Sequence, residues 1–162
     1  MNDVIIKSIK EEDKDLLTEV FFDEKVKKTY MLPDFKNKEE SDKLFNRLKE
    51  LSLNENRFVR GIYYNNQIVG FLNDVEITDE FIELGYAINS KFHNLGIGTK
   101  ALNLGLNELL EKGHKQVITG AFITNKASIR IMEKCGMKKI NRVDFIEYRN
   151  ATHECIYYCK EK

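Results

Sequence analysis

The sequence predicts an α/β fold in which a mixed sheet is covered by about four helices. Apolar residues recur at helical spacing in four segments, and seven short segments have β-type patterns. The two kinds of segment are interleaved along the chain, which favours one sheet with helices packed on it. The 162 residues contain no repeat, low-complexity tract or Gly/Ser/Pro-rich linker, so we expect a single domain over 1–162.

The first half of the chain is predicted to form a strand, two helices and a β-hairpin. Proline cannot continue a helix, so Pro33 separates the two helices. Asn65 and Asn66 tolerate positive φ and can join the hairpin strands in a tight turn. The expected elements are a strand at 4–6, an amphipathic helix from 11 to about 28, a helix over 37–53, and strands over 58–64 and 67–75.

The second half is predicted to alternate strands and helices before a closing hairpin. Gly113 and Gly136 follow the last turns of the two helices, where glycine is favoured. Alternation along the strand at 81–88 places Glu83, Gly85 and Ala87 on one face of the sheet. The expected elements are strands over 81–88 and 116–123, helices over 97–112 and 125–135, and strands over 142–148 and 153–159 around a turn at 150–151.

The composition favours a cytoplasmic protein without a nucleic acid or membrane partner. The 26 basic and 26 acidic residues cancel, so no long-range field attracts nucleic acid. Apolar runs are too short to cross a bilayer, and no secretory signal pattern is present. The three cysteines form no recognisable disulfide framework and the three histidines have no metal-type spacing. We therefore expect reduced thiols and no metal.

The loop after the strand at 81–88 is the clearest candidate ligand site. A helix start leaves main-chain N–H groups unpaired and carries a partial positive charge, which suits phosphate oxygens. Gly96 and Gly98 would let a pyrophosphate approach without a Cβ in the way, although a loop that only needs positive φ would also use glycine. The segment 96–101 also fits the dinucleotide pattern G-x-G-x-x-A, but a long loop precedes it and no acid follows about 20 residues later. A Walker A motif is excluded, since no Gly-Lys-Ser/Thr follows.

Three blocks, in order and spacing, resemble the GNAT superfamily of N-acetyltransferases. The glycine loop resembles the family's pyrophosphate loop, Arg/Gln-x-x-Gly-x-Gly/Ala, with His93 at its first position. The segment 125–128, followed by Gly136-Met137, resembles the family's Asn-x-x-Ser/Ala and Gly-Phe. The segment 83–88 resembles the preceding strand in the ribosomal-protein serine/alanine N-terminal acetyltransferase branch. The resemblance covers about residues 4–159 and implies a mostly antiparallel sheet whose two central parallel strands, 81–88 and 116–123, splay apart.

The resemblance further implies that acetyl-CoA binds in the gap between those two strands as co-substrate. The main chain at 86–88 would pair with the pantetheine arm, the loop at 94–99 would hold the pyrophosphate, and Asn125 would approach from the other side. Asn125 could equally serve only as a helix N-cap. The candidate cofactor-binding residues are Tyr86, Ala87, Ile88, His93, Asn94, Leu95, Gly96, Ile97, Gly98, Thr99, Asn125 and Ser128.

The implied reaction is direct attack of a primary amine on the thioester in a ternary complex. Many GNAT enzymes protonate the leaving thiolate with a Tyr seven residues after the Asn, but Met132 stands there, so Ser128 is the expected substitute. Glu147, in a hairpin resembling that of the ribosomal-protein branch, is the expected base, and Glu83 is the second candidate. A partly desolvated carboxylate with a raised pKa would serve. Each of the three residues also has a plain structural explanation, as a first-turn serine, a solvent-facing strand glutamate or an ion-paired glutamate.

Two alternatives stay open. The acceptor is expected to be a protein or peptide N-terminal amine, but an amino sugar, polyamine or amino acid fits as well, because the first two helices and the last hairpin would form its pocket and their patterns are least informative. The missing tyrosine at 132 also permits a module that binds CoA without turnover. The expected partners are acetyl-CoA and an amine acceptor, in a monomer or homodimer.

Overall fold

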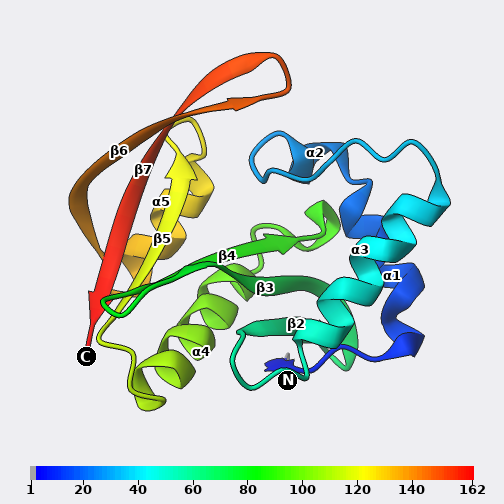
Figure 1. Cartoon of the computed structure of the whole chain (residues 1–162), viewed down its shortest axis with the longest axis horizontal. Coiled ribbons are helices and arrows are strands. Elements are labelled where there is room, and N and C mark those ends of the chain that lie inside the picture. Colours follow the sequence, from blue (N-terminus) through cyan, green and yellow to red (C-terminus); the bar gives the residue numbers. More distant parts are fainter. Residues whose placement is uncertain (1–2) are drawn as a thin grey trace.

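A seven-stranded sheet runs through the whole molecule, with strand order β1-β2-β3-β4-β5-β7-β6 (Figure 1). The computed structural model describes residues 3–162, and in this part of the chain β4 and β5 form the one parallel pair. The predicted mixed, mostly antiparallel sheet with a central parallel pair is confirmed. The strands are β1 (Val4–Lys7), β2 (Val59–Tyr64), β3 (Gln67–Ile77), β4 (Ile82–Ile88), β5 (Gln116–Phe122), β6 (Lys138–Tyr148) and β7 (Ala151–Glu161).

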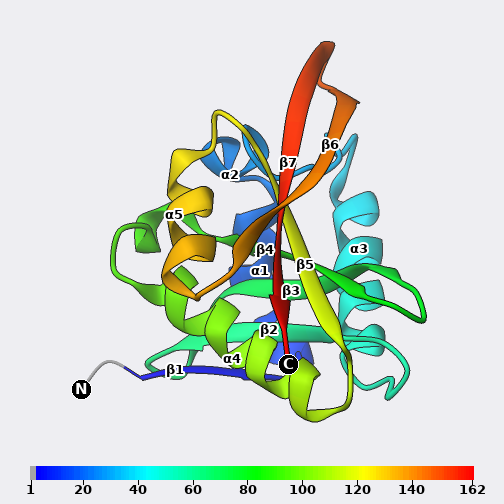
Figure 2. The same ribbon diagram turned by 90° about the vertical axis from the view of Figure 1, so that its left-hand side faces the viewer.

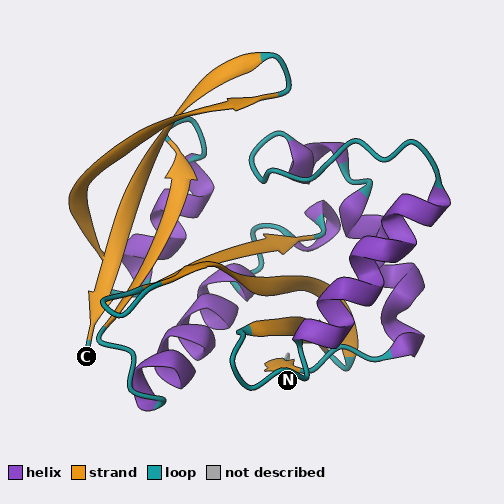
Figure 3. Ribbon diagram, viewed as in Figure 1, coloured by secondary structure: helices purple, strands orange, loops and turns teal. Residues whose placement is uncertain are grey.

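Helices cover both faces of this sheet (Figures 2 and 3). On one face lie α4 (Ile97–Glu111) and α5 (Lys126–Lys134), and on the other lie α1 (Lys14–Phe21), α2 (Glu24–Lys27) and α3 (Lys38–Leu51). Short 3-10 turns precede α1 at Glu11–Asp13 and α4 at Ser90–Phe92.

The single helix predicted from 11 to about 28 is wrong, because the chain breaks between α1 and α2. Helix α1 ends at Phe21 with Phe22 as its C-cap, and Asp23 leaves the helical conformation at ψ 107°. The Asp23 carboxylate accepts a hydrogen bond from the Lys25 main-chain N–H and so caps a new helix. The apolar pattern continues across this cap, which is why spacing alone joined the two helices.

The closing hairpin also differs from its prediction. Its turn lies at Arg149-Asn150, where both residues have positive φ of 52° and 59°, one residue earlier than expected. Strand β6 begins at Lys138 instead of 142, since a register shift between Lys139 and Val143 interrupts its alternation.

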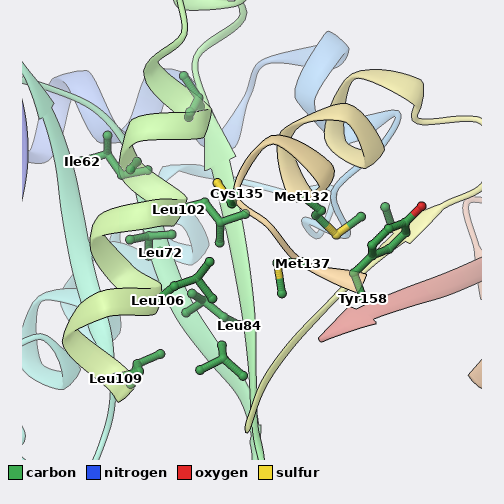
Figure 4. Packing of buried hydrophobic residues seen from close by; sticks show 14 of the residues in the cluster. Ile62, Leu72, Leu84, Leu102, Leu106, Leu109, Met132, Cys135, Met137 and Tyr158 are labelled. Atoms are coloured by element: carbon green, nitrogen blue, oxygen red, sulfur yellow. The ribbon is translucent and has the colours of Figure 1, made fainter. Parts of the chain in front are cut away.

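The sheet divides the core into two large clusters. Leu84, Leu102 and Leu106 belong to the cluster beneath α4 and α5 (Figure 4), whereas Phe21 and Phe45 belong to the cluster beneath α1 and α3. Strand β4 contributes to both, because its alternate side chains point to opposite faces. Leu84 and Ile88 pack toward α4, and Ala87 packs toward α1, as the alternation predicted.

The three cysteines, Cys135, Cys155 and Cys159, are unpaired and buried. Burial raises the pKa of each thiol, which keeps it in the unreactive protonated form. Across residues 3–162, no helix combines the length and apolar character needed to pass through a bilayer.

Candidate active site

The parallel strands β4 and β5 separate soon after they begin. They pair only at Ile82 with Val117 and at Glu83 with Ile118. Beyond this point β4 continues along β3 and β5 continues along β7, so the two strands diverge (Figure 1). Main-chain groups of β4 that face the gap therefore have no partner from β5. The predicted splay of the two central strands is confirmed.

A cavity of about 460 Å³ fills the opening between the diverging strands. Its walls come from the end of β4, the loop before α4 and the start of that helix, the second half of β5, one face of α5, and the segment 26–30 at the end of α2. Every predicted cofactor-binding residue except Leu95 lines it, and the Leu95 side chain is exposed instead. The lining residues among the predicted set are Tyr86, Ala87, Ile88, His93, Asn94, Gly96, Ile97, Gly98, Thr99, Asn125 and Ser128.

The loop before α4 borders this cavity and contains main-chain N–H groups without a hydrogen-bond partner in the described chain. Asn94 and Gly96 have positive φ of 63° and 80°, and they turn the chain so that α4 begins at Ile97. Within residues 3–162, no hydrogen bond occupies the main-chain N–H groups of 94–99, and the first helical bond is from Lys100 to Gly96. Such N–H groups at a helix start, together with the helix dipole, are suited to binding an anion.

The three loop residues that match the predicted pyrophosphate-loop pattern, His93, Gly96 and Gly98, have separate structural roles. A Cβ at Gly96 would meet no atom within 4 Å, so the positive φ alone explains this glycine. A Cβ at Gly98 would lie 2.7 Å from Ile131 Cδ1, so this glycine lets α4 approach α5 at the cavity wall. His93 ties the loop to the strand before it, since its Nε2 lies 2.7 Å from the carbonyl oxygen of Ile88.

Helix α5 brings polar groups to the opposite wall. Asn125 is the N-cap, and its Oδ1 accepts from the main-chain N–H of Ser128. The Ser128 hydroxyl lies 2.6 Å from the Tyr86 hydroxyl of β4. Burial raises the pKa of Tyr86 to about 12. Met132 points into the core beneath α5 (Figure 4) and is fully buried, so it is absent from the cavity wall.

A second set of polar residues lies on the other face of β4, beside the cavity. The Tyr30 hydroxyl donates to Asn73 Oδ1 at 2.5 Å. A Cβ at Gly85 would lie 3.3 Å from atoms of Tyr30, Asn73 and Val75, so only a hydrogen fits there without displacement. Burial raises the pKa of Tyr30, which keeps its hydroxyl protonated. Gly85 and Tyr30 both line the cavity, so it opens to this face as well.

Neither predicted base lines the cavity. The Glu83 side chain is 12% exposed and lies 3.7 Å from the Arg142 guanidinium. Burial raises the pKa of Glu83 even though Arg142 opposes that shift. Glu147 is exposed near the hairpin turn and accepts a hydrogen bond from the Thr152 hydroxyl, so the partial desolvation expected of it is not found. Of the two carboxylates, Glu83 has the environment predicted for a base.

The tip of the β6–β7 hairpin is bound to α2 and to the segment that follows it. The Tyr148 hydroxyl donates to the carbonyl oxygen of Lys27 at 2.7 Å, and it lies 3.2 Å from those of Tyr30 and Leu32. Arg149 pairs with the carboxylates of two residues in this region, Glu24 and Asp34. The hairpin turn and the segment 24–34 are thereby joined beside Tyr30.

This arrangement of a splayed strand pair and a glycine loop coincides with a known domain. The model of the acetyltransferase (GNAT) domain matches residues 3–138. The chain belongs to this family. The predicted assignment to the GNAT acetyltransferases, and with it the prediction of an enzyme, is confirmed.

Solved GNAT structures share the fold over nearly the whole chain. An acetyltransferase (GNAT family) from Bacillus anthracis is 21% identical, with 98% of this chain and 94% of that chain covered and a TM-score of 0.81. The ribosomal L7/L12 alpha-N-protein acetyltransferase RimL in complex with coenzyme A is 16% identical, with 98% and 93% covered and a TM-score of 0.86. The microcin C7 self immunity acetyltransferase MccE in complex with acetyl-CoA and AMP is 20% identical, with 99% and 93% covered and a TM-score of 0.84. A search of curated proteins finds no match.

Sequence reasoning missed several residues that line the cavity of this GNAT domain. Arg130 and Lys134 lie one helical turn apart on α5, and their spacing from Ala127 is a signal that could have placed them on the cavity face. Tyr30 has no such signal, because it lies in an irregular segment and reaches the site only through tertiary contacts. The other missed lining residues are Val26, Thr29, Phe92, Thr119, Gly120, Ala121 and Ile131.

Proposed function

We propose that this GNAT domain transfers the acetyl group of acetyl-CoA to the N-terminal amine of a protein or peptide. The observation that carries the proposal is the cavity between β4 and β5. On one side it meets unpaired N–H groups at the start of α4, and on the other it opens beside Tyr30 and Gly85. Structures of similar fold were solved with CoA and with acetyl-CoA, which supports this donor.

The donor would be held mainly by main-chain groups. The N–H groups of 94–99 would donate to the pyrophosphate oxygens, since they have no other partner within the described residues. Arg130 and Lys134, both exposed at the cavity wall, would add positive charge near the phosphates. The free edge of β4 at 86–88 would pair with the pantetheine amides, as a further strand would.

Transfer joins the amine nitrogen to the thioester carbonyl carbon and breaks the bond from that carbon to sulfur. The electron pair of the broken bond leaves with sulfur, which then takes a proton, and the nitrogen loses a proton to a base. Main-chain N–H groups of β4 that face the gap would stabilise the negative charge on the carbonyl oxygen. The Ser128 hydroxyl, in the cavity wall, would donate to sulfur. Glu83, rather than the exposed Glu147, would accept the amine's proton through water.

The distance of the base from the cavity favours an acceptor whose amine loses its proton easily. No aspartate or glutamate is among the lining residues in the described chain. Deprotonating a lysine ε-amine of pKa about 10.4 costs roughly 4.6 kcal/mol at pH 7, whereas an α-amine of pKa about 7.7–8.0 costs only about 1–1.4 kcal/mol. An α-amine therefore suits a site whose carboxylate acts from a distance.

An amine panel with free-thiol detection tests the function. The panel pairs peptides that begin with Ser or Ala with the same peptides blocked at the N-terminus and carrying an internal lysine, and it adds an amino sugar and a polyamine. We expect the highest kcat/KM for the free α-amines and almost no thiol release with the blocked peptides. Gly98→Glu supplies the inactive control, since it places a carboxylate against Ile131 among the phosphate-binding N–H groups.

Two results would contradict the proposal. A preference for the amino sugar or the polyamine would make the acceptor a small molecule. Binding of acetyl-CoA without thiol release across the panel would indicate a CoA-binding module.

A further inference from the structure

The contact between Tyr86 and Ser128 connects the two walls of the cavity. Alternation along β4 points Tyr86 toward α5, and the first turn of α5 brings Ser128 to meet it. The two hydroxyl oxygens lie 2.6 Å apart, although the residues are 42 positions apart in sequence. Both residues line the cavity. The pair therefore faces the cavity in which the proposed thioester would lie.

Ser128 uses its hydroxyl differently from two serines of the α3 region, Ser41 within the helix and Ser52 at its C-cap. The hydroxyl of Ser41 donates to the carbonyl oxygen of Lys38, and that of Ser52 donates to Lys49, each three residues earlier. Such back-bonding is the usual local choice of a serine near helical carbonyls. Within residues 3–162, the Ser128 hydroxyl makes no such bond and contacts Tyr86 instead.

We propose that Tyr86 is a positioning residue for acetyl transfer, whose hydroxyl donates to Ser128 Oγ and leaves the Ser128 proton free for the leaving sulfur. This inference rests on the proposed function. A serine hydroxyl has one proton and two lone pairs, so it cannot donate to Tyr86 and to sulfur at the same time. The contact supports catalysis only when Tyr86 is the donor.

The Tyr86 phenol keeps the proton that it needs to donate a hydrogen bond to Ser128. Burial keeps its phenol protonated over the whole range in which the enzyme would work, because its pKa is raised to about 12. Hydrogen bonds in a chain strengthen one another, so donation from Tyr86 makes Ser128 a better donor. When the bond to sulfur breaks, the Ser128 proton moves toward the thiolate and the Tyr86 proton replaces it. Tyr86 then regains from solvent the proton that the base released.

A double-mutant cycle tests the pair through turnover. Tyr86→Phe and Ser128→Ala should each lower kcat about tenfold or more, because each weakens a hydrogen bond to a developing charge. The KM for acetyl-CoA should stay within about twofold. The double variant should be no slower than Ser128→Ala alone, since Tyr86 acts through Ser128.

Two further variants separate positioning from packing. Ser128→Thr keeps a hydroxyl, so its rate should still depend on Tyr86. Tyr158→Phe is the matched control, because Tyr158 belongs to the same core cluster and its hydroxyl contacts Glu133 outside the cavity. Its kcat should be unchanged. Loss of rate from Tyr86→Phe that persists in full in the Ser128→Ala background would overturn the proposal, as would a rise in acetyl-CoA KM at constant kcat.

The pair can also be judged without turnover. Donation to sulfur favours the thiolate, so the pKa of the thiol of bound CoA should lie below that of free CoA, as followed by the ultraviolet absorbance of the thiolate. Tyr86→Phe and Ser128→Ala should each raise it, and the double variant should raise it no further. If the wild type releases no thiol with any amine, the proposed function fails, while this titration still decides the pair. If neither variant changes the thiol pKa of bound CoA, the proposed role of Tyr86 is refuted.

Discussion

Replacing Gly85 by alanine should impair binding of the amine without affecting binding of acetyl-CoA. The added Cβ would lie 3.3 Å from Asn73 Oδ1, Tyr30 Cε2 and Val75 Cγ2, so at least one neighbour must retreat by a few tenths of an ångström. Tyr30 and Asn73 are joined by a 2.5 Å hydrogen bond, which limits how far either can move alone. The perturbation therefore falls on the face of β4 opposite α4 and α5.

The expected magnitudes follow from this crowding. Overpacking lowers the free energy of unfolding by about 1–3 kcal/mol. Replacing glycine by alanine raises it by about 0.4–1 kcal/mol, because alanine restricts the unfolded chain. The free energy of unfolding should thus fall by about 1 kcal/mol. An equal loss in acceptor binding would raise the amine KM about five- to tenfold, since 1.4 kcal/mol is a factor of ten.

Gly98→Ala is the matched variant on the donor side. Its Cβ would lie 2.7 Å from Ile131 Cδ1, the end of a flexible side chain that lines the cavity. Displacing Ile131 should weaken acetyl-CoA binding about tenfold and leave the amine KM unchanged. Calorimetry gives the Kd of acetyl-CoA, and steady-state rates at saturating acetyl-CoA give the amine KM. If Gly85→Ala raised the Kd of acetyl-CoA and the amine KM equally, the two faces of β4 would not serve separate binding sites for donor and acceptor.

Three more predictions concern the base, the α5 cap and the hairpin. Because burial raises the pKa of Glu83 and a base must be deprotonated, activity should rise with pH above the usual carboxyl range. Glu83→Gln should erase that limb and Glu147→Gln should keep it; the reverse pattern would restore Glu147 as base. Asn125→Ala should cost about 1 kcal/mol in unfolding free energy and weaken acetyl-CoA binding, and an unchanged Tm would contradict its role as a cap. Tyr148→Phe should lower the free energy of unfolding by about 1 kcal/mol and speed hydrogen exchange of the main-chain N–H groups at 27–32. It should change the amine KM but not the acetyl-CoA KM. Equal exchange rates in the variant and the wild type would contradict this prediction.

The local structure of the proposed donor side could be predicted from the sequence because its signals are local. A glycine with positive φ, a helix start and an Asn cap each depend on neighbours within a few residues, as Gly96 and Asn125 show. These features also fix where β4 ends and α4 begins. The structure adds contacts across the chain that no spacing reveals, such as that between Tyr86 and Ser128.

The acceptor side could not be predicted in the same way. Tyr30 lies in an irregular segment, and its position depends on a partner 43 residues away. The environments of the two candidate bases depend on pairing within the sheet, where the register shift between Lys139 and Val143 has no clear sequence signal. The capping of α2 by Asp23 was hidden by an apolar pattern that continues past it.

The contact of Tyr148 with Lys27 spans 121 positions, so this part of the molecule depends on segments from both halves of the chain. The matched family region stops at residue 138, where β6 begins, and leaves the hairpin outside it. Exchange of the hairpin between related enzymes should therefore alter the amine specificity and leave the affinity for acetyl-CoA unchanged. During synthesis, the contact between the hairpin and the segment around Tyr30, on the proposed acceptor side, can form only after the last two strands have emerged from the ribosome.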